Sequence, residues 1–283
     1  MNKEQNIEIK FQNGSISKID QDVHRLLIEL QQQVRNSKIL PRFFNFTQVI
    51  DNYEKHLLDF YSFLITNRSL SKSQLFQDLF VLFYFKEKKN GTFLDFGATN
   101  GIEKSNSFML ENDFGWSGVL AEPSPQWHDE LVNNRPEAKI IKDAIYSETG
   151  KELDFFVSDA GELSTLEEFK NSDASSMPGN AKVRNKNGYL HKVRTISLND
   201  VFIKFFNGLP IDYMSVDSEG SELMILENFD FKRFGPAVVT VEHNSSEYDN
   251  SNEKKLDALF QNNNYKRIFR EQTQFDAWYV IQN

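Results

Sequence analysis

The stretch Thr92-Phe93-Leu94-Asp95-Phe96-Gly97-Ala98-Thr99-Asn100-Gly101 decides the fold of this chain. Its first half is apolar, rich in β-forming residues and closed by an acid, and a segment that can be helical, Ile102 to Leu110, follows its two glycines. We expect a strand, a tight turn and a helix start, with the glycines letting the backbone approach a ligand closely. A dinucleotide fold would require G-x-G-x-x-G, and here Asp95-Phe96 replaces the first glycine of that pattern.

Strand and helix patterns alternate from this stretch to the C-terminus. The expected strands are residues 92–96, 118–122, 139–145, 153–157, 213–217, 237–242, 265–269 and 277–281. The expected helices include residues 79–86, 125–133, 219–226 and 253–262. This alternation predicts an α/β domain with a mostly parallel sheet and helices on both faces, in which ligands bind beyond the carboxyl ends of the strands. Residues 162–188 are polar, which predicts a mobile loop of the kind that often forms a lid.

The first 70 residues carry patterns of their own. Residues 7–11 and 15–19 alternate in polarity around the turn pair Asn13-Gly14, which predicts a hairpin. Apolar residues at helical spacing predict helices over 23–34 and 47–64, with Thr47 a candidate N-cap of the second. The polar residues 69–73 are the candidate boundary, so we predict a hairpin and helical extension over 1–70 and a main domain over 71–283. The extension either covers the main core or forms a module for homodimerisation or substrate docking.

Composition excludes several classes of protein. The net charge of −9 and the pI of about 5.2 disfavour a nucleic-acid partner, because a phosphate backbone would be repelled. The absence of cysteine excludes disulfides, thiolate metal sites and cysteine nucleophiles. No apolar stretch approaches the ~18 residues of a membrane span, and none follows the N-terminus as in a signal peptide. We therefore expect a cytoplasmic protein.

Acids stand where the first strands end. Asp95 closes the first strand beside Gly97, and Glu122-Pro123 follows the second. An acid at the end of the second strand can accept hydrogen bonds from a ribose diol, although it can also be an ordinary solvated strand-end acid. Asp143, in the third strand, either accepts a hydrogen bond from an adenine amino group or caps a turn.

The later strands end in a second acidic group. Asp217 terminates one strand, and Glu242-His243 terminates the next. A histidine beside a carboxylate can take a proton near neutral pH, and three such side chains can hold Mg²⁺ or Mn²⁺. His243 can also simply form a hydrogen bond at the sheet edge. Glu219 and Glu222 are explained by the favourable interaction of acids with the first turn of a helix.

These residues resemble the FkbM family of S-adenosylmethionine (SAM) dependent methyltransferases, from Ser73 to the C-terminus. The matching motifs are Ser73-Gln74-x-x-Gln77-Asp78, Phe93-Leu94-Asp95-Phe96-Gly97-Ala98-x-Asn100-Gly101, Ser105-Asn106-Ser107, Leu110-Glu111, Gly115-Trp116-x-Gly118-Val119-Leu120-Ala121-Glu122-Pro123-Ser124-Pro125, Asn134-Arg135-Pro136, Ile211-Asp212-Tyr213-Met214-Ser215-Val216-Asp217-x-Glu219-Gly220-x-Glu222, Val241-Glu242-His243-Asn244 and Trp278-Tyr279-Val280. Two positions depart from the family pattern, because Asn100 stands one place later than the usual asparagine and Ser221 precedes the last acid of its motif.

The resemblance implies a Rossmann-like class I methyltransferase fold with a seven-stranded sheet. It also implies SAM as cofactor and methyl transfer to a hydroxyl, often of a sugar or glycan. The residues that it places around the cofactor are Asp95, Gly97, Asn100, Gly101, Ser105, Asn106, Glu122 and Pro123, with Gln77 closing the methionine end.

We expect His243 to be the base that removes the hydroxyl proton, with Asp217 as second choice. Glu242 would orient His243 or hold a metal ion that acidifies the hydroxyl. The alternatives are a non-catalytic scaffold with a SAM fold and a methyltransferase of a non-sugar small molecule. An amino-group methyltransferase of nucleobases would carry an Asn/Asp-Pro-Pro-aromatic turn, which this chain lacks, and an NAD-dependent oxidoreductase would need the missing G-x-G.

Overall fold

The computed structural model describes residues 6–10, 16–20, 55–246 and 249–282, and the chain divides into two compact units, 1–68 and 69–283. In the first unit, strands β1 (Asn6–Lys10) and β2 (Ile16–Asp20) pair antiparallel, which confirms the strands of the predicted hairpin. Helix α4 (Lys55–Asn67) covers the later part of the second predicted helix. The turn Asn13-Gly14, the helix over 23–34 and Thr47 lie outside the described residues. A homodimer through these helices stays a prediction.

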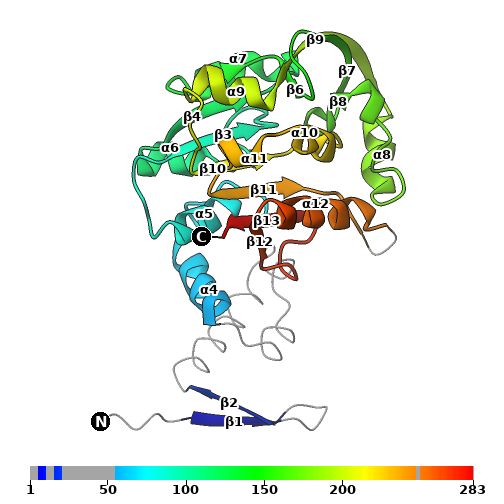
Figure 1. The fold of residues 1–283 in the computed structure, drawn as a ribbon. Helices are drawn as coiled ribbons and strands as arrows, with labels where there is room; N and C mark the ends of the chain where they lie inside the picture. Colours follow the sequence, from blue (N-terminus) through cyan, green and yellow to red (C-terminus); the bar gives the residue numbers. More distant parts are fainter. Residues whose placement is uncertain (1–5, 11–15, 21–54, 247–248, 283) are drawn as a thin grey trace. The chain divides into compact units, whose positions relative to one another are not determined.

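The second unit is built on a seven-stranded sheet, which confirms the predicted α/β class (Figure 1). Five adjacent strands are parallel, and β13 runs antiparallel to its two neighbours. In spatial order the strands are β12 (Tyr265–Ile268), β13 (Asp276–Ile281), β11 (Val238–Glu242), β10 (Tyr213–Val216), β3 (Thr92–Phe96), β4 (Ser117–Ala121) and β5 (Lys139–Ile141).

Helices cover both faces of this sheet, as two neighbouring residues of β13 show. Trp278 stacks on Phe80 of α5 (Gln77–Tyr84), with ring centroids 4.5 Å apart. Tyr279 stacks on Phe260 of α12 (Ser251–Asn262) at 3.8 Å. Successive side chains of a strand point to opposite faces, so α5 and α12 lie on opposite sides of the sheet. The other helices of this unit are α6 (Phe108–Phe114), α7 (His128–Asn134), α8 (Pro178–Arg184), α9 (Leu198–Phe205), α10 (Glu222–Glu227) and α11 (Phe231–Phe234).

A second, four-stranded sheet corrects two of the predicted strands. The strand expected over 139–145 splits into β5 and β6 (Ala144–Tyr146), and the one over 153–157 is β7 (Glu152–Ser158) of the second sheet. β7 pairs with β8 (Thr165–Leu166) and with β9 (Gly188–Ser197), which pairs in turn with β6. An apolar run shows that a strand forms, but its partner depends on contacts distant in sequence.

Residues 162–188, predicted to be a mobile loop, contain regular secondary structure. They include most of the 3₁₀ turn Gly161–Leu163, strand β8, the 3₁₀ turn Glu167–Phe169 and helix α8. Proline in the first turn and lysine and arginine in the last turn favour this helix. We refer to residues 161–187 as the cover segment.

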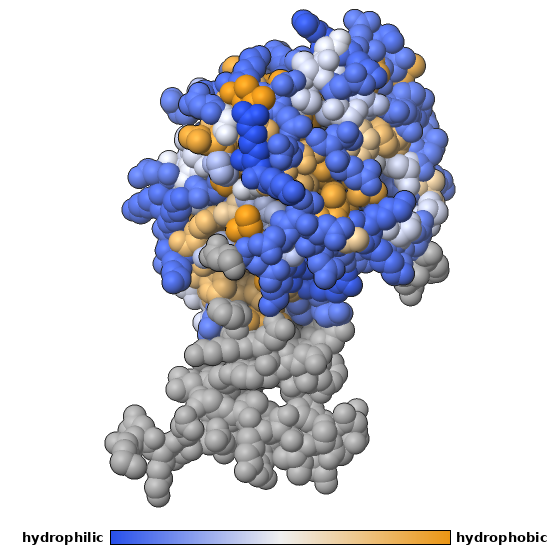
Figure 2. Space-filling model, in the orientation of Figure 1, coloured by the Kyte–Doolittle hydropathy of each residue, from blue (hydrophilic) through white to orange (hydrophobic). Residues whose placement is uncertain are grey.

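The molecular surface is mainly polar on the face drawn in Figure 2, with apolar side chains gathered near its middle. Within the described part of the chain, no helix is both long and apolar enough to cross a membrane.

Candidate functional site

Four neighbouring strands end in one row of the sheet. Phe96 is paired with Ala121 on one side and with Val216 on the other, and Val216 is paired with Val241. The next residues along these strands are Gly97, Glu122, Asp217 and Glu242. The parallel register therefore brings together a turn glycine and three acids that are far apart in sequence. This is the carboxyl edge of the sheet, where ligands of such folds bind.

Gly97 permits the close approach of two of these strand ends. Its φ is +84°, and a Cβ atom there would lie 2.1 Å from the backbone oxygen of Asp217. The Gly97 amide donates to the Ala121 oxygen at 3.0 Å, and the Asp217 amide donates to the Phe96 oxygen at 3.2 Å. Any side chain at position 97 would force the strand ends apart, so the glycine is required by geometry.

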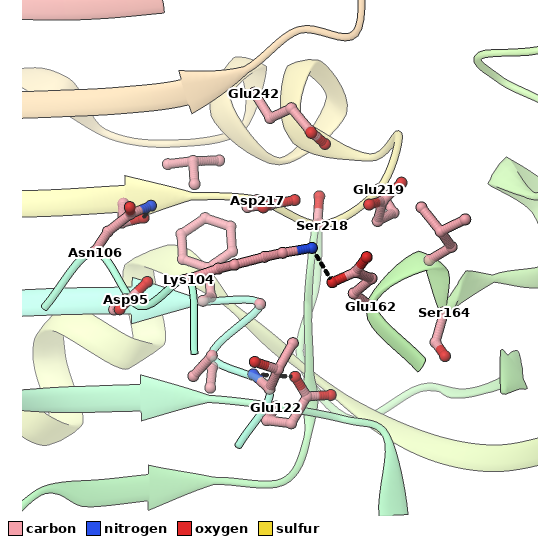
Figure 3. A pocket seen from close by; sticks show the side chains of 18 of the residues that line it. Asp95, Lys104, Asn106, Glu122, Glu162, Ser164, Asp217, Ser218, Glu219 and Glu242 are labelled. Atoms are coloured by element: carbon pink, nitrogen blue, oxygen red, sulfur yellow. Dashed lines mark hydrogen bonds and ion pairs between the residues drawn. The ribbon is translucent and has the colours of Figure 1, made fainter. Parts of the chain in front are cut away.

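A cavity of about 560 Å³ opens above this row (Figure 3). Nine of the residues predicted from the sequence line it, namely Gln77, Asp95, Gly97, Ser105, Asn106, Glu122, Pro123, Asp217 and Glu242. Four predicted residues are not among those that line it, namely Asn100, Gly101, Asp143 and His243. Asp143 directly precedes Ala144 and Ile145, which do line the cavity.

Glu122 lies at the β4 end of the cavity. Its carboxylate accepts hydrogen bonds from the backbone amides of Thr99 and Ser124, both at 2.8 Å. Burial raises its pKa to about 7. Each oxygen has taken one donor and keeps further accepting capacity, so the carboxylate can bind hydroxyl groups of a ligand.

Asp95 and Asn106 line the cavity nearer the start of α6. Burial raises the pKa of Asp95, whose carboxylate accepts a hydrogen bond from the Ser107 hydroxyl at 2.7 Å. Asn106 donates from Nδ2 to the Ser215 hydroxyl at 2.9 Å. The Oδ1 atom of Asn106 is buried and has no hydrogen-bond partner among the described residues. A buried acceptor of this kind is costly unless a ligand donates to it.

Asn100 and Gly101 do not line the cavity, and their hydrogen bonds stabilise the turn that does. The Oδ1 atom of Asn100 accepts from the amides of Ile102 and Glu103, at 3.0 and 2.9 Å. The Gly101 oxygen accepts from the guanidinium of Arg135 at 2.9 Å. Arg135 is buried, pairs with Glu111 and also donates to the Ser105 and Ser107 hydroxyls. The Asn-Arg-Pro motif thus holds the shape of the turn.

Asp276, which sequence reasoning missed, joins Gln77 at the β13 side of the cavity. Its Oδ2 atom accepts from Nε2 of Gln77 and from Nε1 of Trp278, both at 2.9 Å. Burial raises its pKa to about 6. The sequence offered one signal for Asp276, because it is an acid that directly precedes the last expected strand, residues 277–281.

Asp217, Glu219 and Glu242 converge on one point. One carboxylate oxygen of each lies within 4.8 Å of the others, and Figure 3 shows these side chains along the same wall of the cavity. Burial, reinforced by the negative charge of Glu222, raises the pKa of Asp217 to about 7. Burial also raises the pKa of Glu242, with repulsion from Asp217 as a further cause. Two such carboxyls can share one proton, which either can exchange with a ligand.

Glu219 was assigned from the sequence to the first turn of a helix, and the structure corrects this. Helix α10 begins at Glu222, and Glu219 precedes it with φ +58°. Its carboxylate accepts from the guanidinium of Arg184 at 2.7 Å. Glu222 instead shapes the loop, because its Oε1 accepts from the amides of Ser218 and Gly220 at 2.8 and 3.0 Å.

His243 points away from this cluster. Its side chain lines a separate small hollow, and its Nδ1 accepts from the Ser245 amide at 3.0 Å. Burial and the nearby positive charge of Arg267 lower its pKa to about 3. Glu242 accepts a hydrogen bond from Nδ2 of Asn244 at 2.8 Å. The role of His243 as base therefore stays a prediction without support from its position.

The cover segment closes one side of the cavity. It contributes Leu163, Met177 and Val183 to the lining. Lys104, on the loop after the glycine turn, forms an ion pair with Glu162 of the cover segment, and Figure 3 shows this pair lying across the cavity. The segment is fastened by Arg184, which is fully buried and pairs with Asp173 at 2.6 Å and with Glu219.

Comparison with known proteins gives one match to a family model and several weak structural similarities. The sequence model of the methyltransferase FkbM domain matches residues 95–267. The structure resembles the SAH-bound methyltransferase PaMTH1 of Podospora anserina at 9% identity and a TM-score of 0.40, over 85% of this chain and 97% of that chain. It resembles the precorrin-6y C5,15-methyltransferase of Geobacter metallireducens at 11% identity and a TM-score of 0.37, over 73% and 87% of the two chains. No curated protein matches the sequence.

Proposed function

The chain belongs to the FkbM methyltransferase family, and we propose that it transfers a methyl group from SAM to a hydroxyl of a sugar or glycan. The observation that carries this proposal is the pair Asp217 and Glu242, which lines the same cavity as the glycine turn and Glu122. A hydroxyl must lose its proton when it is methylated, and a carboxyl with a raised pKa is a suitable acceptor near neutral pH.

The residues of the cavity fit SAM. When bound, SAM supplies a methyl group activated by a positively charged sulfur. Glu122 is placed to accept from the ribose hydroxyls, and the buried Oδ1 of Asn106 offers an acceptor for the ammonium group. Gln77 and Asp276 offer further polar atoms at the β13 side of the cavity. Gly97 keeps the ends of β3 and β10 close together, and so supports the floor of the cavity.

The acidic pair supplies the proton transfer. SAM would supply the methyl group and leave as the demethylated thioether, and the acceptor hydroxyl would give up its proton to this pair. The hydroxyl proton goes to Asp217, and Glu242 stabilises the shared proton. The positions of the side chains favour Asp217 over His243 as the base, because only Asp217 lines the cavity.

A divalent cation is the alternative way to activate the hydroxyl. Asp217, Glu219 and Glu242 offer oxygen ligands of the kind that Mg²⁺ and Mn²⁺ prefer, in place of the predicted set that included His243. Bound there, the ion would acidify the acceptor hydroxyl.

The test is methyl transfer from labelled SAM to a panel of sugars and glycans, with added Mg²⁺ and with EDTA. For Asp217→Asn we expect a loss of turnover of about 10²-fold or more, with binding of the demethylated cofactor retained by calorimetry. His243→Ala and the surface control Asp154→Asn should stay within a few-fold of wild type. Near-normal turnover of Asp217→Asn would refute the assignment of Asp217 as the base. A large loss of turnover in His243→Ala would support His243 as the base instead. Loss of activity in EDTA would favour the metal.

A further inference from the structure

The charged side chains that line the cavity are almost all acidic. Among the described residues that line it, one carries a positive charge, Lys104, and none is arginine or histidine. The eight carboxyl side chains of the lining are Asp95, Glu103, Glu122, Glu162, Asp217, Glu219, Glu242 and Asp276.

Few of these carboxyls are neutralised by a cation. Lys104 is paired with Glu162, and about half of each side chain is exposed to solvent. Glu219 is paired with Arg184, whose guanidinium is fully buried behind the cavity wall and is therefore unable to meet a ligand. Asp217 and Glu242 have no cation among their hydrogen-bond or ion-pair partners within the described residues.

The charges divide between the two ends of the cavity. Asp95 and Glu122 belong to the end that we assign to the cofactor. Glu219 lies beside Asp217 and Glu242 at the end left for the acceptor, where Asp276 is paired in register with Glu242, and Glu162 lies between the two ends (Figure 3). An anionic group placed there would face a wall of carboxyl groups with reduced solvent screening, and the one lysine of the described lining, Lys104, is already paired with Glu162.

We propose that the acceptor is a neutral or cationic hydroxyl compound, such as an unsubstituted sugar or an amino sugar, and that phosphate and carboxylate groups are rejected. This inference rests on the proposed function. Like charges across a binding site exclude a competing ligand even where its shape fits, so the cavity selects by repulsion as well as by contact. The methylated sugar would then not be a nucleotide sugar. Methylation would take place on a sugar that lacks its phosphate, before activation or after transfer to a glycan.

The test uses acceptors that share one sugar ring and differ in the charge of a single substituent. Methyl glycosides with gluco, galacto and manno rings are offered as the amino sugar, the neutral sugar and the uronic acid, together with the sugar 1-phosphates, at saturating SAM. We expect kcat/KM for the amino or neutral sugar to exceed that for the acid of the same ring by tenfold or more. For rings that are not methylated, dissociation constants from enzyme loaded with the demethylated cofactor give the same ranking.

Charge variants at the rim of the cavity make the test specific. Glu162→Gln and Glu103→Gln should reduce the ratio of kcat/KM for the neutral acceptor to kcat/KM for the anionic acceptor several-fold. Glu137→Gln, on an exposed site outside the cavity, should leave this ratio unchanged. Added salt should reduce the ratio as well. A uronic acid or phosphate that is methylated or bound as well as the neutral sugar overturns the inference while leaving methyl transfer intact. Cofactor binding without binding of any neutral or cationic probe also counts against it, and loss of cofactor binding would count against the proposed function itself.

Discussion

At the scale of the residue, Gly97 is where the sequence leaves the least freedom. Gly97→Ala would place a Cβ atom 2.1 Å from the Asp217 oxygen, at a φ of +84°. We expect a loss of at least about 2 kcal/mol in the free energy of unfolding and loss of cofactor binding, because backbone has to move. Urea denaturation and calorimetry with the demethylated cofactor measure the two effects.

Gly150 provides the matched control. Its φ is +88°, and no atom lies within 4 Å of a Cβ built there. Gly150→Ala therefore carries the backbone strain without the clash and should cost about 1 kcal/mol, with binding unchanged. If both variants lose the same stability and both bind the cofactor, the contact between the strand ends is not what requires Gly97.

Single residues were predictable where the motif is local. Asp95, Gly97 and Glu122 follow directly from strand ends in the sequence, and all three line the cavity. Glu242 and His243 are adjacent, and one-dimensional spacing does not decide which of them faces the ligand. The structure turns Glu242 toward Asp217 and buries His243 elsewhere. The position of Glu219 at the cavity depends on a left-handed backbone conformation, which cannot be predicted from a glutamate in the sequence.

At the scale of the element, the cover segment is fastened by one side chain. Arg184 of α8 donates to the Leu163 and Lys170 oxygens, to both oxygens of Asp173 and to Glu219. Arg184→Met would leave two buried or partly buried carboxylates without their cation, at a cost of about 3–5 kcal/mol. We expect rapid proteolysis within residues 161–187, measured by limited digestion and mass spectrometry.

Lys182→Met is the control for this variant, since Lys182 is an exposed cation of the same helix. It should be digested at the wild-type rate. The double variant Asp173→Asn, Arg184→Met should lose less free energy of unfolding than the sum of the two single variants. The reason is that Asp173→Asn removes the carboxylate that Arg184→Met leaves without a cation. Equal protection of the cover segment in Arg184→Met and in wild type would show that its packing suffices without the ion pairs.

Elements of the main sheet were predictable because their apolar runs and helix spacings are local signals. Strands β3, β10 and β11 lie close to their expected bounds. The second sheet was not predictable in the same way. Strand β9 exposes Tyr189 and Leu190, so it lacks the apolar continuity of a buried strand, and its pairing with β7 closes a long loop. The segment that forms α8 is short and polar, and the burial of Arg184 is a tertiary effect.

At the scale of the whole molecule, the buried acids of the cavity make the free energy of unfolding depend on pH. The pKa of Asp217 is about 7 in the folded protein against an ordinary value of 3.8. Between these values the folded chain holds a proton that the unfolded chain releases, so the free energy of unfolding falls as the pH rises. Asp217→Asn removes this penalty. The variant that we expect to lose activity should therefore be more stable than wild type at pH 8, by at most about 4 kcal/mol.

The advantage of Asp217→Asn should shrink as the pH falls from about 7 and vanish below about pH 3, where the wild-type carboxyl is protonated in both the folded and the unfolded state. Urea denaturation of cofactor-free protein at several pH values measures it, with Glu137→Gln as the control that should run parallel to wild type. A stability difference independent of pH would mean that Asp217 ionises normally in the folded chain, and it would also remove the basis for its role as a base near neutral pH. If the difference in the free energy of unfolding between Asp217→Asn and wild type grows with pH, the ionised carboxylate of Asp217 destabilises the folded protein. The same charge would then serve catalysis and reduce stability, as in other active sites where function has a cost in stability.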